Sequence, residues 1–442
     1  MTASALAPPG DEPRSLARAV GWLAVLGVIF FSTYGFSNWL ASTRTGVPVF
    51  VFEWERHIPF AAWTIIPYWS IDLLYGVSVL LCRTRRELDT HVKRLFTAQA
   101  ISVACFIAFP LRFSFDRPEV DGGFGWLFGA LVSFDKPFNQ APSLHIALLV
   151  IIYVRLLAHV RAPVFRWIVH AWMLLIGVSV LTTYQHHFID LPTGALVGFI
   201  CLWLWPDDGP SPLGHWRWTA DPQRRRLAAR YLAGAVACAA VGVAVGGWAL
   251  WLWWPAVSLL AVALNYAGFG AAGFQKSERG QLSLAARWLL APYLAGAWIS
   301  SRAWTRGEPA AHAIADDVWL GRLPTGTELA ASRFHALVDL TAELSAAAGT
   351  RAYSAYPLLD LTVAPPHTLA EAARAIERHR AAGPVLVCCA LGYSRSASAV
   401  AAWLLATGRA RDVAEAVDAI GRARPRIVLG GEHRRALEAI AG

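Results

Sequence analysis

The stretch VLVCCALGYSRS, residues 385–396, decides how the C-terminal part of this 442-residue chain folds. Its apolar beginning predicts a buried β-strand, and the residues at 396–405, rich in Ala, Val and Leu, predict a helix. The loop between them can curl its backbone N–H groups around a phosphate, with Gly392 at the tight bend. Because the N-terminus of the predicted helix faces the same loop, the segment indicates an anion-binding site.

The loop also carries a cysteine and an arginine six residues apart. We expect Cys389 to act as a thiolate nucleophile, since a positive environment favours that form of the side chain. The planar guanidinium of Arg395 can hold two phosphate oxygens, and Ser396 can hydrogen-bond the sulfur. The alternative is a buried structural cysteine beside a surface arginine. The order of strand, Cys, Gly, Arg, Ser and helix favours the catalytic interpretation.

This segment resembles the signature loop of the cysteine-dependent dual-specificity phosphatases, in which His-Cys is followed by five residues and then Arg-Ser. The resemblance covers residues 310–442 and implies an α/β phosphatase domain. It also implies a general acid on a loop upstream of the cysteine. Asp360 stands in the matching place, and Asp339, in an apparent strand, is the competing carboxylate. Cys388 stands where the family usually has His, which implies either weaker tuning of the thiolate or an oxidation partner for Cys389.

The rest of the chain has the composition of a membrane protein. Hydrophobic residues make up 56% of the sequence and 21 residues are Trp, which lies outside the range of soluble domains. Apolar stretches of roughly 18–22 residues are long enough to cross a bilayer. About eight such spans are predicted, at residues 18–38, 62–82, 95–112, 143–160, 166–183, 190–206, 230–247 and 249–268.

Basic residues set the predicted orientation. They precede the first span, fill the loop after the second, and flank the segments after the fourth and the sixth. The positive-inside rule places all four segments in the cytoplasm. With eight spans the C-terminal domain is cytoplasmic too, in a reducing compartment where a catalytic thiolate survives. We therefore predict a multi-pass protein of a bacterial-type inner (plasma) membrane.

A second set of polar residues lies in the membrane half, on the predicted outer side. Ser143 and His145 open the fourth span, and His186 and Asp190 lie between the fifth and the sixth. If 186–190 is helical, the last two are one turn apart, so the carboxylate can orient the imidazole. Two histidines that face one phosphate suffice for a phosphohistidine mechanism without a metal. The alternative is a set of packed histidines with Asp190 as a helix cap, but ionisable groups at membrane depth are costly and usually functional.

These motifs resemble the phosphatidic acid phosphatase type 2 superfamily, and most closely its branch of sphingomyelin and inositol phosphorylceramide synthases. The resemblance covers residues 60–206 and implies a six-helix core. The implied roles are nucleophile for His186, orienting partner for Asp190, general acid for His145 and phosphate ligand for Ser143. Arg117 and Arg112 are the candidates for a cation that binds the phosphate. Val180 stands where the superfamily usually has an arginine, which leaves this site short of cations.

The predicted segments are a six-helix membrane phosphatase or phosphotransferase domain at 1–206, a cytoplasmic linker at 207–229, a transmembrane hairpin at 230–268, an amphipathic juxtamembrane connector at 269–309 and the phosphatase domain at 310–442. A ninth span in the connector, the alternative, would reverse the topology.

The predicted function is a bifunctional membrane phosphatase that acts on phosphate monoesters. We expect lipid phosphates as substrates, with phosphoproteins as an alternative, and no cofactor, metal or nucleic acid. Two further alternatives are a head-group phosphotransferase coupled to the phosphatase, and a membrane scaffold or phospholigand sensor with one inactive site.

Overall fold

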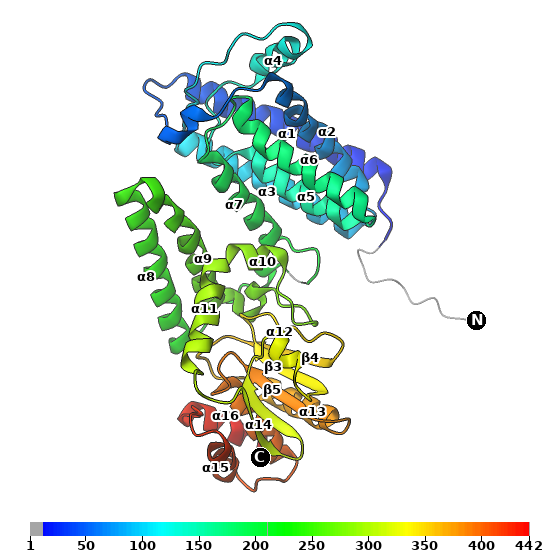
Figure 1. Cartoon of the computed structure of the whole chain (residues 1–442), viewed down its shortest axis with the longest axis vertical. Coiled ribbons are helices and arrows are strands. Elements are labelled where there is room, and N and C mark those ends of the chain that lie inside the picture. Colours follow the sequence, from blue (N-terminus) through cyan, green and yellow to red (C-terminus); the bar gives the residue numbers. More distant parts are fainter. Residues whose placement is uncertain (1–11, 210, 442) are drawn as a thin grey trace, which may run out of the picture. The chain divides into compact units, whose positions relative to one another are not determined.

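The computed structural model describes residues 12–209 and 211–441 (Figure 1). The chain divides into two compact units, one that ends at Ser211 and one that begins at Pro212. The first unit is helical, and the second combines a helical hairpin and connector with an α/β domain.

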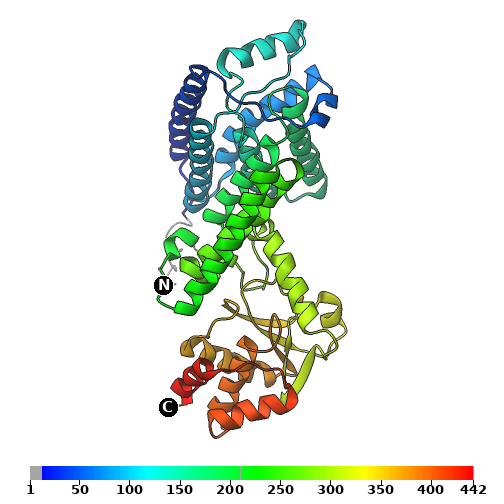
Figure 2. The same cartoon turned by 90° about the vertical axis from the view of Figure 1, so that its left-hand side faces the viewer.

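The N-terminal unit is a bundle of long helices with one short helix, α4, at its end (Figures 1 and 2). Its elements are α1 (Leu16–Ser42), η1 (Glu53–His57), η2 (Ala62–Thr64), α2 (Ile65–Leu81), α3 (Arg85–Ala108), α4 (Gly122–Phe134), α5 (Leu144–His159), α6 (Pro163–Thr182) and α7 (Asp190–Leu204). Two glycines of α7 let it approach α5 closely. A Cβ on Gly194 would lie 2.4 Å from the carbonyl oxygen of Ser143, and one on Gly198 would lie 2.7 Å from Cβ of Val150. This contact brings the start of α7 to the start of α5.

Five helical stretches of the described residues are long and apolar enough to cross a membrane, judged by length and composition: Leu16–Ser42, Ala62–Leu81, Pro163–Thr182, Pro222–Val245 and Gly247–Phe274. The helices α4, α5 and α7 are apolar but shorter. The predicted span at 95–112 needs correction. It lies in α3 only as far as Ala108, and α3 begins at Arg85 with a charged half and is not among the five. Helix α4 has only 13 residues and was not predicted.

The basic residues after the second predicted span were expected to lie in a loop. Most of them lie in the first half of α3, where Arg94 pairs with Asp207 at 3.1 Å. Asp207 accepts a second contact of 2.9 Å from Arg155. Asp207 therefore joins two buried arginines at the surface of the bundle, and the start of the predicted linker is tied to this unit.

The C-terminal unit begins with a hairpin and a connector. Its elements are η3 (Pro212–His215), α8 (Pro222–Val245), η4 (Gly247–Leu252), α9 (Trp253–Leu264), η5 (Asn265–Phe269), η6 (Gly270–Phe274), α10 (Leu284–Leu289) and α11 (Ala291–Trp304). Helix α8 starts inside the segment predicted as a linker, because the Asp221 side chain accepts a hydrogen bond from Gln223 N–H and Pro222 occupies the first turn. The end of the predicted linker, residues 222–229, is therefore helical.

The α/β domain has one mixed five-stranded sheet with the order β1-β2-β5-β3-β4. The strands are β1 (Ala311–Ala315), β2 (Val318–Arg322), β3 (Ala336–Thr341), β4 (Ala352–Leu358) and β5 (Val385–Cys389), and only β1 runs antiparallel to its neighbour. The remaining helices are α12 (Gly326–Ala330), α13 (Pro366–Arg380), α14 (Arg395–Ala406), α15 (Val413–Ala423) and α16 (Gly431–Ala441). The predicted α/β architecture is confirmed for this domain.

Strand β5 is central in the sheet and buried along its whole length. One face of the sheet packs against α13, α14, α15 and α16 in a large apolar core, which includes Cys389. The other face carries a smaller cluster with Cys388, against which Ala297 of α11 packs. Alternation along a strand sends adjacent side chains to opposite faces, so the two cysteines lie in different clusters.

Candidate functional site

The loop after β5 surrounds the sulfur of Cys389 with hydrogen-bond donors. The backbone N–H of Gly392 donates to Sγ at 3.2 Å, and the Ser396 hydroxyl donates to it at the same distance. Helix α14 begins at Arg395, so its N-terminus points at this loop. These donors and the helix dipole all stabilise negative charge at the sulfur. The loop therefore offers the environment that a thiolate nucleophile needs.

Gly392 is the position at which only glycine is tolerated. Its φ is +77°, and a Cβ there would lie 2.5 Å from the carbonyl carbon of Gly321 on the neighbouring strand β2. Other residues rarely adopt this conformation. The bend expected at this position is therefore a requirement of both the backbone and the packing.

Arg395 is buried and held by carboxylates. Its two terminal nitrogens donate to the two oxygens of Glu343 at 2.8 and 2.7 Å, and one of them contacts Asp360 at 2.9 Å. It also donates to the carbonyl of Leu358. Burial alone would lower the pKa of Arg395, but Glu343 and Asp360 outweigh burial, and the pKa is raised well above its usual value. The nearby sulfur of Cys389 acts in the same direction. The guanidinium is thus a fixed positive charge at the loop.

Asp360 lies on the loop after β4, as expected, and reaches the same arginine. Its side chain is 35% exposed, so it can also meet solvent or a ligand. Two residues from the preceding helical hairpin hold this loop. The Tyr266 hydroxyl of η5 donates to the Asp360 carbonyl at 2.9 Å, and the Gln223 amide of α8 donates to the Leu361 carbonyl at 2.6 Å.

The competing carboxylate, Asp339, is fully buried in β3 and has four donors. They include Lys276 Nζ at 2.6 Å and the Tyr353 hydroxyl at 2.8 Å. Lys276 also donates to the carbonyl and the hydroxyl of Thr341. This network joins the connector to the sheet, and all four donors hold the Asp339 carboxylate inside the domain.

Cys388 does not face Cys389. It is fully buried, and burial first and the Asp339 charge second raise its pKa well above the usual value. Both cysteines are free. Because they point to opposite faces of β5, the geometry does not favour the pairing considered from the sequence.

Several residues that sequence reasoning missed contact the loop after β5 from outside. Arg424 donates to the Leu391 carbonyl at 2.9 Å and lies over the Tyr393 ring at 5.1 Å. The Ser301 hydroxyl of α11 donates to the Ala390 carbonyl. Arg424 begins an Arg-Pro-Arg segment close to the C-terminal helix α16. No local pattern marked Ser301 or Glu343.

The polar residues of the N-terminal unit also meet. Nδ1 of His186 lies 2.9 Å from Asp190 Oδ2, and Nε2 lies 3.2 Å from the Ser143 hydroxyl. All three side chains are buried. The predicted contact between His186 and Asp190 exists, but residues 186–189 are not helical. Asp190 is instead the first residue of α7, and a turn brings it back to the imidazole.

His145 and Arg117 lie at the edges of this group. The His145 ring stacks on Tyr68 with centroids 4.3 Å apart, and its Nε2 has no hydrogen-bond partner among the residues described. Arg117 donates to the carbonyls of Thr183 and Tyr184, which precede His186 in the chain. His187 takes a separate position, with Nδ1 3.2 Å from Glu55 Oε2.

Comparison with known proteins separates the two halves. Residues 318–441 match the model of the dual specificity phosphatase catalytic domain, which supports a phosphatase of phosphate monoesters in this part of the chain. No curated protein matches the chain. No family match supports the resemblance of the membrane half.

Similar solved structures cover the same domain. The crystal structure of Tk-PTP in the active form is 28% identical, with a TM-score of 0.28, and the match covers 30% of this chain and 97% of Tk-PTP. Human DUSP28 is 24% identical, with a TM-score of 0.26 and coverage of 30% and 93%. PTPMT1 in complex with PI(5)P is 21% identical, with a TM-score of 0.28 and coverage of 30% and 95%.

Proposed function

We propose that the C-terminal domain hydrolyses phosphate monoesters through a phosphocysteine intermediate. Cys389 Sγ attacks phosphorus, the bond from phosphorus to the leaving oxygen breaks, and Asp360 donates a proton to that oxygen. Arg395 and the loop N–H groups hold the remaining oxygens. Water then cleaves the sulfur–phosphorus bond, gives a proton to Asp360 and releases phosphate.

The observation that carries this proposal is the convergence of the sulfur, its two donors and a buried charged arginine at one helix N-terminus. In the unliganded site one nitrogen of Arg395 contacts Asp360. A bound phosphate would take that place, which frees the carboxyl group to reach the leaving oxygen.

We infer a lipid monophosphate as the substrate. The loop that carries Asp360 is hydrogen-bonded to Tyr266 and Gln223, which belong to a hairpin long and apolar enough to cross a membrane. A site tethered at a bilayer meets lipid phosphates at high effective concentration. The loop residues 390–394 include no Lys or Arg, which favours a single phosphate over a polyphosphorylated ring.

The test of the substrate class is turnover by the full chain in detergent micelles. A panel of diacyl lipid monophosphates is compared with phosphopeptides and with a soluble aryl phosphate, and Cys389→Ser serves as the blank. The proposal predicts a higher kcat/KM for at least one lipid than for any phosphopeptide. Preference for phosphopeptides would contradict the lipid assignment and leave the phosphocysteine chemistry standing.

For the N-terminal unit we propose a separate histidine site for lipid phosphate hydrolysis or head-group transfer on the outer side of the membrane. The contacts of His186 support it, because Asp190 orients the ring through Nδ1 and Nε2, the nitrogen that would attack, lies beside the Ser143 hydroxyl. His186→Ala should remove an activity that survives Cys389→Ser and needs no added divalent metal. If Cys389→Ser has no residual activity on lipid phosphates, this second site is inactive.

A further inference from the structure

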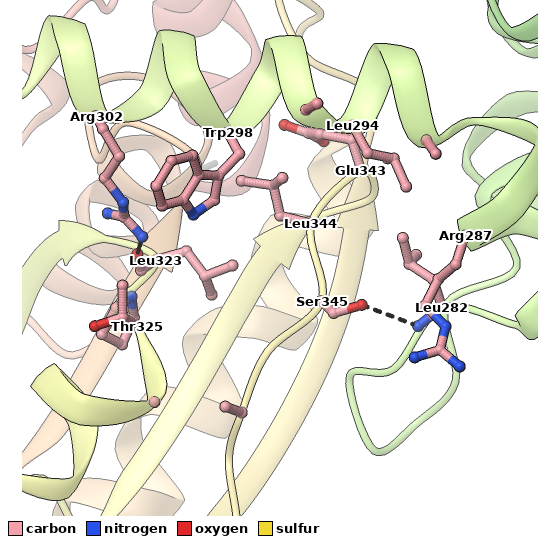
Figure 3. Close-up of a pocket in the computed structure, with 15 residues that line it drawn as sticks. Leu282, Arg287, Leu294, Trp298, Arg302, Leu323, Thr325, Glu343, Leu344 and Ser345 are labelled. Atoms are coloured by element: carbon pink, nitrogen blue, oxygen red, sulfur yellow. Dashed lines mark hydrogen bonds between the residues drawn. The ribbon is translucent and has the colours of Figure 1, made fainter.

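A cavity of about 560 Å³ lies between the connector and the α/β domain, apart from the catalytic sulfur. Helices α10 and α11 form one wall, and the segments after β2 and β3 form the other (Figure 3). The volume is in the range of small-molecule sites. Most of the side chains that line it are apolar, among them Leu282, Leu294, Trp298, Leu323 and Leu344.

The charged side chains of the lining have an excess of cations. Arg287 and Arg302 contribute two positive charges, whereas the single carboxylate, Glu343, is already neutralised by Arg395. Arg302 donates one hydrogen bond, to the Leu323 carbonyl at 3.0 Å (Figure 3). Its Nε and Nη1 are buried and have no hydrogen-bond partner in residues 12–209 and 211–441. The guanidinium lies over the Trp298 ring of the same lining, with its carbon 5.6 Å from the ring centroid. Its positive charge, together with that of Arg287, favours an anion that enters the cavity.

Both walls of the cavity touch the catalytic loop. Glu343 lines the cavity and holds Arg395, and the residue before Arg302 in α11, Ser301, donates to the Ala390 carbonyl. The segment after β3 is also fixed to the connector, because the Ser345 hydroxyl accepts a hydrogen bond from Leu282 N–H at 3.3 Å (Figure 3). A ligand in the cavity would therefore contact the same two elements that position the catalytic groups.

We propose that this cavity binds the acyl chain of an anionic lipid, with the acidic head near Arg302. An apolar lining suits a hydrocarbon chain, and the positive charges of Arg287 and Arg302 suit a phosphate or carboxylate head group. The connector follows a hairpin long and apolar enough to cross a membrane, which brings lipid within reach. The site is distinct from the phosphatase chemistry, and the inference does not rest on the proposed substrate, because binding is measured without turnover.

The experiment is photo-crosslinking of the full chain in nonionic detergent with a diazirine-bearing palmitate, followed by mass spectrometry of the labelled peptides. Two variants address the cavity. Ala295→Phe places a large ring on the lining face of α11, and Arg302→Gln removes the positive charge. The matched control is Arg306→Gln, an arginine just after α11 that is not part of the lining. A diazirine-bearing hexadecanol is the neutral counterpart of the probe.

We expect the palmitate to label peptides of α11 and of the 343–347 segment. Labelling should fall about tenfold in each cavity variant, which corresponds to the loss of roughly 1.4 kcal/mol of binding free energy. It should stay unchanged in Arg306→Gln. The folding control is hydrolysis of a soluble aryl phosphate. A rate within about twofold of wild type shows that a variant folds.

Equal labelling of wild type and Ala295→Phe would overturn the assignment of the cavity, as would labelling confined to other peptides. Equal labelling by palmitate and hexadecanol would overturn the role of Arg302. If Ala295→Phe loses aryl phosphate hydrolysis, Ala347→Leu on the opposite wall replaces it as the filling variant.

Discussion

Arg395 and Glu343 form a two-point ion pair in which each guanidinium nitrogen meets its own carboxylate oxygen, at 2.8 and 2.7 Å, and both side chains are at most 3% exposed. The pair fixes the plane of the guanidinium before any phosphate binds. A preoriented arginine loses less entropy when it forms hydrogen bonds in the transition state.

The first prediction concerns this pair. Glu343→Ala leaves a buried charge without its main partner, which typically destabilises a protein by about 3–5 kcal/mol. We expect a lower thermal inactivation temperature of phosphatase activity and a raised KM for aryl phosphate. Glu343→Gln keeps the shape and should lose less stability. Wild-type stability and KM in Glu343→Ala would argue against the positioning role.

Asp360 is predicted to matter only when the leaving group needs a proton. Asp360→Asn should lower kcat on alkyl and lipid monophosphates about 100-fold or more, in line with the usual size of general acid catalysis. Hydrolysis of p-nitrophenyl phosphate should fall much less, because its leaving oxygen is stable as an anion. The measurement is the ratio of kcat values on the two substrates. An equal loss on both would assign the proton transfer to another group.

Lys276 is predicted to hold the connector to the sheet. Its ammonium group is buried between Asp339 and Thr341. Lys276→Met leaves Asp339 charged and buried, so we expect destabilisation of about 3–5 kcal/mol, seen as faster thermal loss of phosphatase activity. Lys276→Met combined with Asp339→Asn should recover part of that loss. No recovery in the double variant would show that the effect of Lys276 does not pass through Asp339.

His433 is predicted to make the phosphatase domain less stable in mild acid. Its Nε2 lies 2.9 Å from the Ser394 hydroxyl, and burial lowers its pKa below the usual 6.5. The fold therefore favours neutral His433. Its contribution to stability is complete above pH 6.5 and is lost as the pH falls below that value. The measurement is thermal inactivation of wild type and of His433→Asn between about pH 7.5 and about pH 5, a range that spans the ordinary His pKa. The rate of inactivation should depend less on pH in the variant. Parallel curves would exclude this contribution.

The C-terminal fold was largely predictable because its decisive residues are adjacent in the sequence. A strand, a glycine bend and a helix start fall within residues 385–396, and local geometry brings Gly392, Ser396 and Cys389 together. The partners of Arg395 were harder to predict. Glu343 lies 52 residues before it, and only the sheet order, which places β3 beside β5, brings the two together.

The membrane half shows the limits of hydropathy. Apolar length located the long helices and missed α4, and capping residues and charged turns set where the helices begin. Thr84 caps α3 by accepting a hydrogen bond from Glu87 N–H, which extends that helix ten residues before the predicted span. Large side chains such as Val28, Leu73 and Leu174 are 67–71% exposed. Outward apolar surface of this kind is what a span presents to lipid, and it agrees with the composition.

The most direct measurement is a rapid acid quench of the full chain during hydrolysis of a phosphorus-labelled aryl phosphate. The account predicts a covalent phosphoenzyme whose label maps to the peptide that contains Cys389 and is released by iodine, as a thiophosphate is. It also predicts no label on that peptide and no aryl phosphate hydrolysis in Cys389→Ser. Hydrolysis that persists in Cys389→Ser, or a label on another residue of the C-terminal domain, would contradict the central claim.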